Sequence, residues 1–401
     1  MTPRVRREAF ATSVRRGTPL VWATGAGDDL RALLGWGERF RATASGPERF
    51  TALADAFRAF AAQSAGSTDD PHDLVAFATL TFSPDSDAAS TLVVPQVLGR
   101  WSRGVLTVPD GAEVPDPTAP AEFEELDLLP GDLTRERYRR AVATAVARIE
   151  AGEFAKVVLA RDLEAAGPDP VDVPAVLTRL QQANPDSFTF HVDGLVGASP
   201  ELLVARRGPT VISRALAGSA PVTGDPQQDD QLAERLAHSA KDLEEHRYAA
   251  HSVADRLATL ADVMVSSPSV WRLTRIMHLA TDISGTLRPD HAHRSALDVA
   301  AALHPSAAVC GTPTEAAASV LAELEGFDRG RYAGPVGWLD ATGDGEFALA
   351  LRCGQLSPDG RSVRLYAGGG IVADSVPSAE LAETAQKFLP MYEALSPVAR
   401  P

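Results

Sequence analysis

Near its C-terminal end the chain reads Arg364-Leu-Tyr-Ala-Gly-Gly-Gly-Ile-Val372 and soon afterwards Ser378-Ala-Glu-Leu-Ala-Glu-Thr-Ala-Gln-Lys387. The first segment predicts an apolar strand that three glycines interrupt. The second predicts an amphipathic helix with Ser378 as its N-cap residue. Glycines weaken a strand, so three in succession indicate a bend or a ligand that approaches the backbone closely.

The predicted helix carries Glu380, Glu383 and Lys387 on one face, at i, i+3 and i+7. This arrangement is typical of a solvated helix with an i, i+4 Glu–Lys pair, and it is also compatible with carboxylates that reach a site. Taken alone, the helix favours the solvated alternative. Other segments of the sequence are needed to distinguish a solvated face from carboxylates that reach a site.

The composition is that of a globular protein with a large core, because 45% of the 401 residues are hydrophobic and 23% are charged. A net charge of -15 argues against an electrostatic nucleic-acid binder and against an anionic membrane surface as partner. Cys310 and Cys353, without metal-ligand spacing, predict a reducing compartment and no disulfide framework. No apolar run has membrane-spanning length and the Arg-rich start lacks a signal-peptide core, so a cytoplasmic protein is expected.

The chain divides into three stretches. Residues 1–108 mix short apolar runs with Gly/Pro punctuation, include a helix expected from Glu48 to Ala61, and carry no evident chemistry. Residues 109–132 are acidic and proline-rich, a composition typical of a connection. Strands and hairpins alternate with helices over residues 133–395, the α+β pattern. We expect a single domain over residues 1–401, with the catalytic part in its last stretch.

Three charged side chains lie in apolar strand sequence. Lys156 opens one strand, where a lysine usually extends to solvent. Glu201 lies in a strand expected to run from Gly194 to Ala205, where burial would raise its pKa as a general acid requires, unless it points outward. Arg352 ends another apolar strand, and a guanidinium there either reaches water or binds an anion such as a carboxylate.

A single long helix is expected from about residue 226 to residue 261. Its polar face gathers Glu234, His238, Lys241 and Glu245, which alone would be a solvated face. His278 follows in an apolar run, where a histidine is more often a hydrogen-bonded core residue than a catalyst.

Nine segments occur in the order and approximate spacing of the chorismate-utilising enzymes, which the chain resembles over about residues 130–395. They are Lys156-Val-Val-Leu-Ala-Arg, Gly197-Ala-Ser-Pro-Glu-Leu-Leu, Leu216-Ala-Gly-Ser, Lys241-Asp-Leu-Glu-Glu-His, Leu303-His-Pro, Gly334-Pro-Val-Gly-Trp, Leu351-Arg-Cys, Ala367-Gly-Gly-Gly-Ile-Val and Ala382-Glu-Thr-Ala-Gln-Lys. Each segment is unspecific alone, whereas nine in order are specific and outweigh the solvated-face alternatives. The N-terminal third matches only in placement.

The resemblance implies a chorismate-utilising enzyme fold of the α+β class, in which large antiparallel sheets enclose a deep site and helices lie outside. It implies chorismate as substrate and Mg²⁺ as cofactor, with Glu245 and Glu383 as the metal carboxylates, which suits a cation that keeps waters and substrate oxygens. Lys156 would be the general base and Glu201 the general acid. The substrate-binding residues that it implies are Gly218, His278, Ala308, Tyr332, Arg352, Gly368, Gly370 and Lys387.

The superfamily includes isochorismate synthases, salicylate synthases, anthranilate synthase component I and aminodeoxychorismate synthase component I. Lys156 matches the lysine of the members that use water as nucleophile, so no amidotransferase subunit is expected. Ala217 stands where aminodeoxychorismate synthases carry a nucleophilic lysine. Ser219 and Leu303-His-Pro resemble isochorismate synthases more than salicylate synthases, which are the alternative. Ala215 and the pair Ala308-Val309 depart from the usual pattern and affect the fine positioning of substrate.

The reaction that the resemblance implies is a magnesium-dependent displacement across the chorismate ring. Lys156 would take a proton from a water that attacks C2, and Glu201 would protonate the departing C4 hydroxyl. Such an acid and base need pKa values shifted in opposite directions. A non-catalytic carboxylate-binding module is the alternative of another class, and the joint presence of Lys156, Glu201, Glu245 and Glu383 argues against it. A monomer is expected, and the residues do not distinguish menaquinone from siderophore synthesis as the fate of the product.

Overall fold

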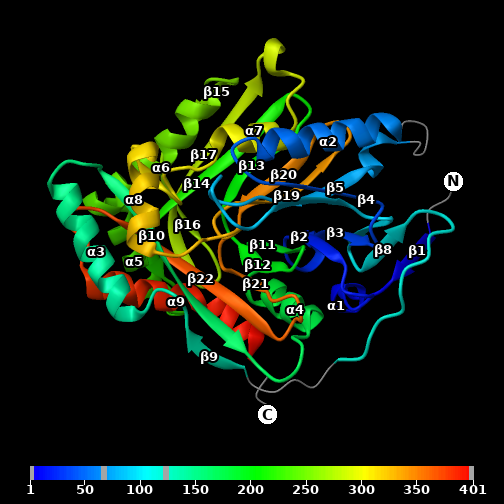
Figure 1. Cartoon of the computed structure of the whole chain (residues 1–401), viewed down its shortest axis with the longest axis horizontal. Coiled ribbons are helices and arrows are strands. Elements are labelled where there is room, and N and C mark those ends of the chain that lie inside the picture. The colour runs from blue at the N-terminus through cyan, green and yellow to red at the C-terminus, as the bar shows by residue number, and fades with distance from the viewer. Residues whose placement is uncertain (1–3, 65–69, 121–125, 397–401) are drawn as a thin grey trace.

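The computed structural model of the chain describes residues 4–64, 70–120 and 126–396. Within these residues, two large antiparallel sheets pack against one another and helices lie on their outer sides (Figure 1). The sheets do not close into a barrel. The α+β fold with antiparallel sheets and outer helices, predicted from the sequence, is confirmed.

The first sheet contains twelve strands among the described residues. In spatial order they are β1 (Arg4–Arg7), β8 (Val105–Val108), β7 (Val97–Ser102), β3 (Arg31–Trp36), β2 (Leu20–Thr24), β11 (Phe188–Val192), β12 (Leu195–Ser199), β21 (Cys353–Leu356), β22 (Ser362–Ile371), β10 (Lys156–Ala166) and β18 (Gly311–Thr312), with β9 (Asp127–Pro130) also paired to β10.

The second sheet contains ten strands within the same described ranges. In spatial order they are β15 (Ala261–Val265), β17 (Ile276–Leu287), β14 (Thr210–Pro221), β13 (Leu202–Arg207), β20 (Gly345–Leu349), β19 (Pro335–Asp340), β5 (Val75–Thr79), β6 (Ser90–Val94) and β4 (Phe40–Ala44), with β16 (Ser269–Arg272) paired to β17.

The helices connect and cover these sheets (Figure 1). They are α1 (Phe10–Val14), α2 (Arg49–Gln63), α3 (Arg135–Glu150), α4 (Val173–Ala183), α5 (Pro226–His238), α6 (Ala240–Leu257), α7 (Ala296–Leu303), α8 (Thr314–Glu325), α9 (Pro377–Leu395) and the short 3₁₀ turns η1 (Gly27–Asp29), η2 (Pro71–Asp73) and η3 (Pro289–His291). None of the helices in the described ranges is long and apolar enough to cross a membrane.

The N-terminal stretch is built into both sheets. Strand β2 pairs with β11 in the first sheet, and β5 pairs with β19 in the second. The end of the proline-rich connection also joins a sheet, because β9 pairs with β10. Residues 121–125 of that connection lie outside the described residues.

Two of the places where the chain passes from one sheet to the other matter for the site. The strand expected from Gly194 to Ala205 is in fact two strands, β12 in the first sheet and β13 in the second, and Pro200 and Glu201 form the crossing. Pro200 has no N–H group to continue a strand ladder, which accounts for the break. Arg352 lies in the partner crossing, from β20 to β21. Because β12 pairs with β21 and β13 with β20, the two crossings lie side by side.

The three glycines do not interrupt their strand, and that prediction is wrong. Strand β22 continues to Ile371 and stays in register with β10, with Gly368, Gly369 and Gly370 opposite Ala160, Leu159 and Val158. The glycines are explained by close approach instead, since a Cβ at Gly370 would lie 2.3 Å from Glu245 Oε1.

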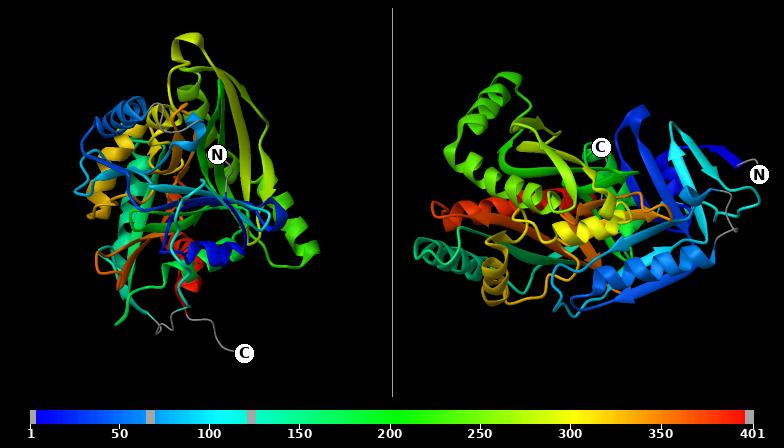
Figure 2. Two further views of the ribbon diagram at one scale, coloured as in Figure 1. Left: turned by 90° about the vertical axis from the view of Figure 1, so that its right-hand side faces the viewer. Right: turned by 90° about the horizontal axis from the view of Figure 1, so that it is seen from above.

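Two predictions about helices are corrected. The long helix expected over residues 226–261 is divided at Ser239, whose extended backbone ends α5 and whose hydroxyl accepts a hydrogen bond from Asp242 N at the start of α6. Figure 2 shows α5 and α6 beside each other, far from the N-terminal strands. Ser378 is not an N-cap either, because α9 begins at Pro377, whose ring favours the first helical position.

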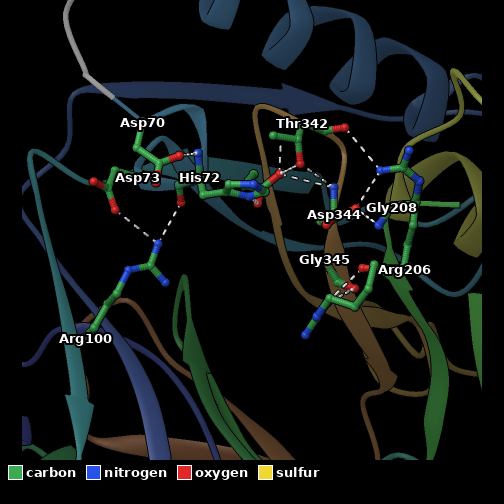
Figure 3. A network of polar contacts seen from close by, with 11 residues as sticks. Asp70, His72, Asp73, Arg100, Arg206, Gly208, Thr342, Asp344 and Gly345 are labelled. Atoms are coloured by element: carbon green, nitrogen blue, oxygen red, sulfur yellow. Dashed lines mark hydrogen bonds and ion pairs between the residues drawn. The ribbon is translucent and has the colours of Figure 1, made fainter. Parts of the chain in front are cut away.

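A polar network fixes the η2 turn to the β19–β20 turn (Figure 3). His72 Nδ1 lies 2.8 Å from Asp340 Oδ2, and the other Asp340 oxygen accepts hydrogen bonds from Thr342 and from Asp344 N. This network joins the N-terminal stretch to the second sheet through polar contacts as well as through strand pairing.

Candidate active site

The twelve residues that the sequence assigns to the site all line one pocket. They are Lys156, Glu201, Gly218, Glu245, His278, Ala308, Tyr332, Arg352, Gly368, Gly370, Glu383 and Lys387. The pocket lies where the two crossings pass between the sheets, and α6 and α9 add side chains to it. The fold therefore brings these residues together, while their individual roles stay predictions.

Lys156 does not extend to solvent. The residue is only 1% exposed, and its Nζ lies 3.2 Å from Glu245 Oε1. An ammonium group buried to this degree needs an anionic partner, which Glu245 provides from α6. Glu245 therefore faces the pocket, and the solvated-face alternative does not apply to it.

Glu201 lies at the crossing between β12 and β13, with its carbonyl held by Leu349 N at 3.1 Å. Burial raises the pKa of Glu201 to about 7, although the positive charges of Lys156, Lys387 and Arg352 oppose that rise. The raised pKa is the one that the sequence predicted for this position. A carboxyl group in this state can donate a proton near neutral pH.

His278, on β17, is neutral in the pocket wall. Burial lowers its pKa to about 3, and the neighbouring Arg352 charge lowers it further. Its Nδ1 lies 3.2 Å from the Gly218 carbonyl oxygen and 3.0 Å from Ser219 Oγ. Because a carbonyl oxygen only accepts, Nδ1 is assigned the proton, and its N–H group donates a hydrogen bond to the Gly218 carbonyl oxygen. Nε2 is then a buried acceptor without a partner among the described residues, suited to a hydroxyl or water of the substrate complex.

Arg352 occupies the second crossing with a positive φ of 48°, which is uncommon for a residue with a side chain. Its guanidinium has no hydrogen bond or ion pair with any described residue, and burial lowers its pKa. Tyr332, 4% exposed, lines the pocket beside it. An unpaired guanidinium directed into a pocket suits a carboxylate ligand.

Helix α9 places Glu383 and Lys387 over β22. Lys387 Nζ lies 2.6 Å from Glu383 Oε1 and donates to the Gly368 carbonyl oxygen at 2.8 Å. Burial alone would raise the pKa of Glu383, but the Lys387 charge and hydrogen bond hold it below its usual range. Glu383 is therefore an anion in the pocket at neutral pH.

The sequence interpretation left four charged pocket residues without a role: Lys241, Asp242, Glu380 and Arg329. Glu380 is 3% exposed, and burial together with the nearby Glu383 charge raises its pKa. The sequence did contain a signal for Glu380, because it lies three residues before Glu383 on α9 and therefore on the same helix face. Glu234 and His238, expected on the same face as Glu245, do not line this pocket, because the break at Ser239 turns α5 away.

The donor set fits a hard divalent cation. Glu245, Glu380 and Glu383 offer carboxylate oxygens beside Gly369 and Gly370, where a Cβ would lie 3.1 Å from Glu380 Oε2 and 2.3 Å from Glu245 Oε1. Within the described residues, no three His, Cys, Asp or Glu side chains converge closely enough to form a complete metal cage. Such a site suits Mg²⁺, which takes one or two protein carboxylates and completes its shell with water and substrate oxygens.

Comparisons with known proteins show which family the chain belongs to. The sequence profile of the family described as "Chorismate binding enzyme" matches residues 113–396. The chain is 42% identical to the isochorismate synthase DhbC of Bacillus subtilis over 273 residues, which are 65% of this chain and 68% of that protein. It is 44% identical to the putative isochorismate synthase MenF of Mycobacterium tuberculosis over 257 residues, 61% of this chain and 68% of that protein.

A solved structure shows the same architecture. The crystal structure of a putative 2,3-dihydroxybenzoate-specific isochorismate synthase, DhbC from Bacillus anthracis, superimposes with a TM-score of 0.79 and 32% identity, covering 94% of this chain and 96% of that one. The family profile spans all twelve pocket residues and most of the chain. The chain therefore belongs to the family of chorismate binding enzymes.

Proposed function

We propose that the protein is an isochorismate synthase, an isomerase that interconverts chorismate and isochorismate. The observation that carries the proposal is the joint placement of a buried Lys156 and a buried Glu201, whose pKa is raised to about 7, in one pocket. Relatives at 42% and 44% identity that carry the name isochorismate synthase support the same reaction.

In this proposal, Lys156 reacts as its uncharged amine and takes a proton from a water molecule whose oxygen bonds to C2 of the ring, which returns the side chain to the ammonium form that pairs with Glu245. Both conjugated double bonds of the ring shift by one position, the bond from C4 to its hydroxyl breaks, and Glu201 gives its proton to that hydroxyl, which leaves as water. One water enters and one leaves, so the product is an isomer of the substrate. Each positioned acid or base contributes about 10²- to 10⁴-fold to the rate.

Arg352, with its unpaired guanidinium, would hold a carboxylate of chorismate, and backbone N–H groups of Gly368 and Gly370, which line the same pocket, would assist it. We propose Mg²⁺ as the cofactor, held by Glu245 and Glu383 with Glu380 nearby. The bound ion would supply positive charge that orients and neutralises the ring carboxylate. The protein residues alone carry the proton transfers.

A chromatographic time course with chorismate and Mg²⁺ tests the function, with pyruvate measured in parallel. We expect isochorismate and a plateau mixture that is reached from either compound, because moving a hydroxyl leaves the bond types nearly unchanged. Stoichiometric pyruvate and salicylate would instead assign the alternative, salicylate synthase. Anthranilate formed only with ammonia would contradict the role of water as nucleophile.

A further inference from the structure

A buried ion pair at the edge of the pocket has no part in the proposed chemistry. Glu325 is the last residue of α8 and is 2% exposed. Arg329, four residues later, is 4% exposed. Arg329 Nη2 lies 2.5 Å from Glu325 Oε1, and Arg329 Nε donates to Glu325 Oε2 at 2.9 Å. Arg329 also lines the pocket.

The pair occupies a gap in the edge of β10. This strand has β18 beside its first two residues and β9 beside its last four, with no strand between them among the described residues. In that gap, Arg329 Nη2 donates to the Val158 carbonyl oxygen at 2.6 Å, and Glu325 Oε1 accepts from Ala160 N at 2.7 Å. The Arg329 guanidinium and the Glu325 carboxylate thus satisfy the two backbone groups that a neighbouring strand would otherwise pair with.

The same guanidinium also holds a second segment of the pocket. Arg329 Nη1 donates to the Val309 carbonyl oxygen at 2.8 Å, in the turn that carries Ala308. The turn contacts β10 directly, since Val158 N donates to the Cys310 carbonyl oxygen at 2.8 Å. Arg329 therefore fixes the distance between the strand that carries Lys156 and the turn that carries Ala308.

We propose that Arg329, held in place by Glu325, is a positioning residue for the base Lys156 and for the wall formed by Ala308 and Val309. A planar guanidinium can serve two carbonyls and a carboxylate at once, whereas a lysine ammonium at the same place cannot reach all three. Arg352 at the crossing and Gly368 on β22, which are proposed to bind a substrate carboxylate, make no hydrogen bond or ion pair with Glu325 or Arg329.

The inference rests on the proposed function for its main readout, the conversion of chorismate. Arg329→Lys should lower kcat by about tenfold to hundredfold, the scale expected when a reacting group is displaced by about an ångström. KM should change less than kcat, because the pair has no hydrogen bond to Arg352 or Gly368, whereas Arg329 is bonded directly to the strand that carries Lys156. Glu325→Gln should lower kcat in the same direction, since it loosens Arg329 while an amide oxygen can still accept from Ala160 N.

Arg16→Lys is the matched control. Arg16 is 6% exposed, pairs with Glu8 at 2.8 Å and donates to the Pro115 carbonyl oxygen at 2.9 Å, so it makes the same kinds of contact outside the pocket. This control should leave kcat and KM unchanged. A kcat of folded Arg329→Lys equal to that of Arg16→Lys would overturn the inference, and so would a loss of activity that merely follows the unfolded fraction.

Two further measurements keep the test decisive. If Arg329→Lys does not fold, Glu325→Gln takes its place with the same expected and contrary results. A wild-type protein that leaves chorismate unchanged would contradict the proposed function. In that case, amide hydrogen exchange still tests whether Arg329 holds β10 and the turn at Ala308 in place. Exchange in residues 156–160 and 306–312 should be faster in Arg329→Lys than in Arg16→Lys, and equal rates would overturn the inference.

Discussion

Lys156 Nζ and Glu245 Oε1 lie 3.2 Å apart inside the pocket, so the proposed base and a proposed metal ligand are partners in one ion pair. The lysine side chain is 1% exposed and the glutamate side chain 17%. Because the ammonium group is the more deeply buried of the two, it depends on Glu245 for its charge compensation. Breaking a buried pair from one side typically costs about 3–5 kcal/mol, so variants of either residue need a check of folding.

Replacement of either proposed proton carrier should abolish most turnover without unfolding the protein. We expect Lys156→Ala and Glu201→Gln each to lower kcat by about 10²- to 10⁴-fold, the usual contribution of a positioned acid or base. Steady-state kinetics with chorismate measures this, and circular dichroism checks the fold. A folded Lys156→Ala variant with a normal rate would remove the base assignment.

The activity should fall as the pH rises above neutrality. Glu201 must be protonated to donate, and burial raises its pKa to about 7, so the acid form is lost above that pH. The profile of kcat/KM reports groups of the free enzyme, and we expect its alkaline limb to bend near this value. A profile that stays flat far into the alkaline range would show that Glu201 is not the acid.

Removal of the metal should stop the reaction reversibly. We expect chelator-treated protein to be inactive and to recover with Mg²⁺, because two carboxylates and substrate oxygens suffice to bind this cation. Glu245→Gln and Glu383→Gln should weaken Mg²⁺-dependent chorismate binding in calorimetry. Glu244→Gln, a change at an exposed neighbour on α6, is the control and should bind normally. Unchanged affinities in both pocket variants would refute the assignment of these ligands.

Added methyl groups on β22 should disturb the pocket in a graded way. At Gly370 a Cβ would lie 2.3 Å from Glu245 Oε1 and 3.0 Å from Lys156 Cε, whereas at Gly369 it would meet Glu380 Oε2 at 3.1 Å. Gly370→Ala should therefore lower kcat more than Gly369→Ala does, because it displaces the Lys156–Glu245 pair. Equal activities of the two variants would contradict the close approach.

The contact between His72 and Asp340 should make stability depend on pH (Figure 3). The hydrogen bond and charge of Asp340 raise the pKa of His72 above its ordinary value. The protonated pair stabilises the fold below the ordinary pKa of histidine, and this contribution is lost as the pH rises through the raised pKa. His72→Gln should thus lower the unfolding temperature at mildly acidic pH and have little effect at alkaline pH. His251→Gln, a change at an exposed histidine, is the control. A His72→Gln variant whose unfolding temperature changes by the same amount at every pH would refute the prediction.

The sequence alone determined the class of fold and the members of the site. Nine short segments in family order predicted the antiparallel α+β architecture. Nine of the twelve site residues lie in these segments, His278, Ala308 and Tyr332 lie outside them, and all twelve line one pocket. This is possible because residue type and spacing along the chain record which chemistry a position must provide. A carboxylate in apolar sequence, such as Glu201, already indicates a raised pKa, and the structure bears that out.

Only the tertiary structure decided what each of these side chains faces. Local periodicity predicted one helix over residues 226–261, because nothing in the neighbouring sequence indicates the extended backbone of Ser239. It also predicted that the three glycines break their strand, because the pairing of β22 with β10 has no local signal. The burial of Lys156 against Glu245 depends on α6, which is remote in sequence. The use of Glu325 and Arg329 as a substitute strand is equally invisible in the sequence, because it depends on which edge of β10 is left unpaired. Such contacts arise between distant segments, and a single sequence does not encode them as a pattern.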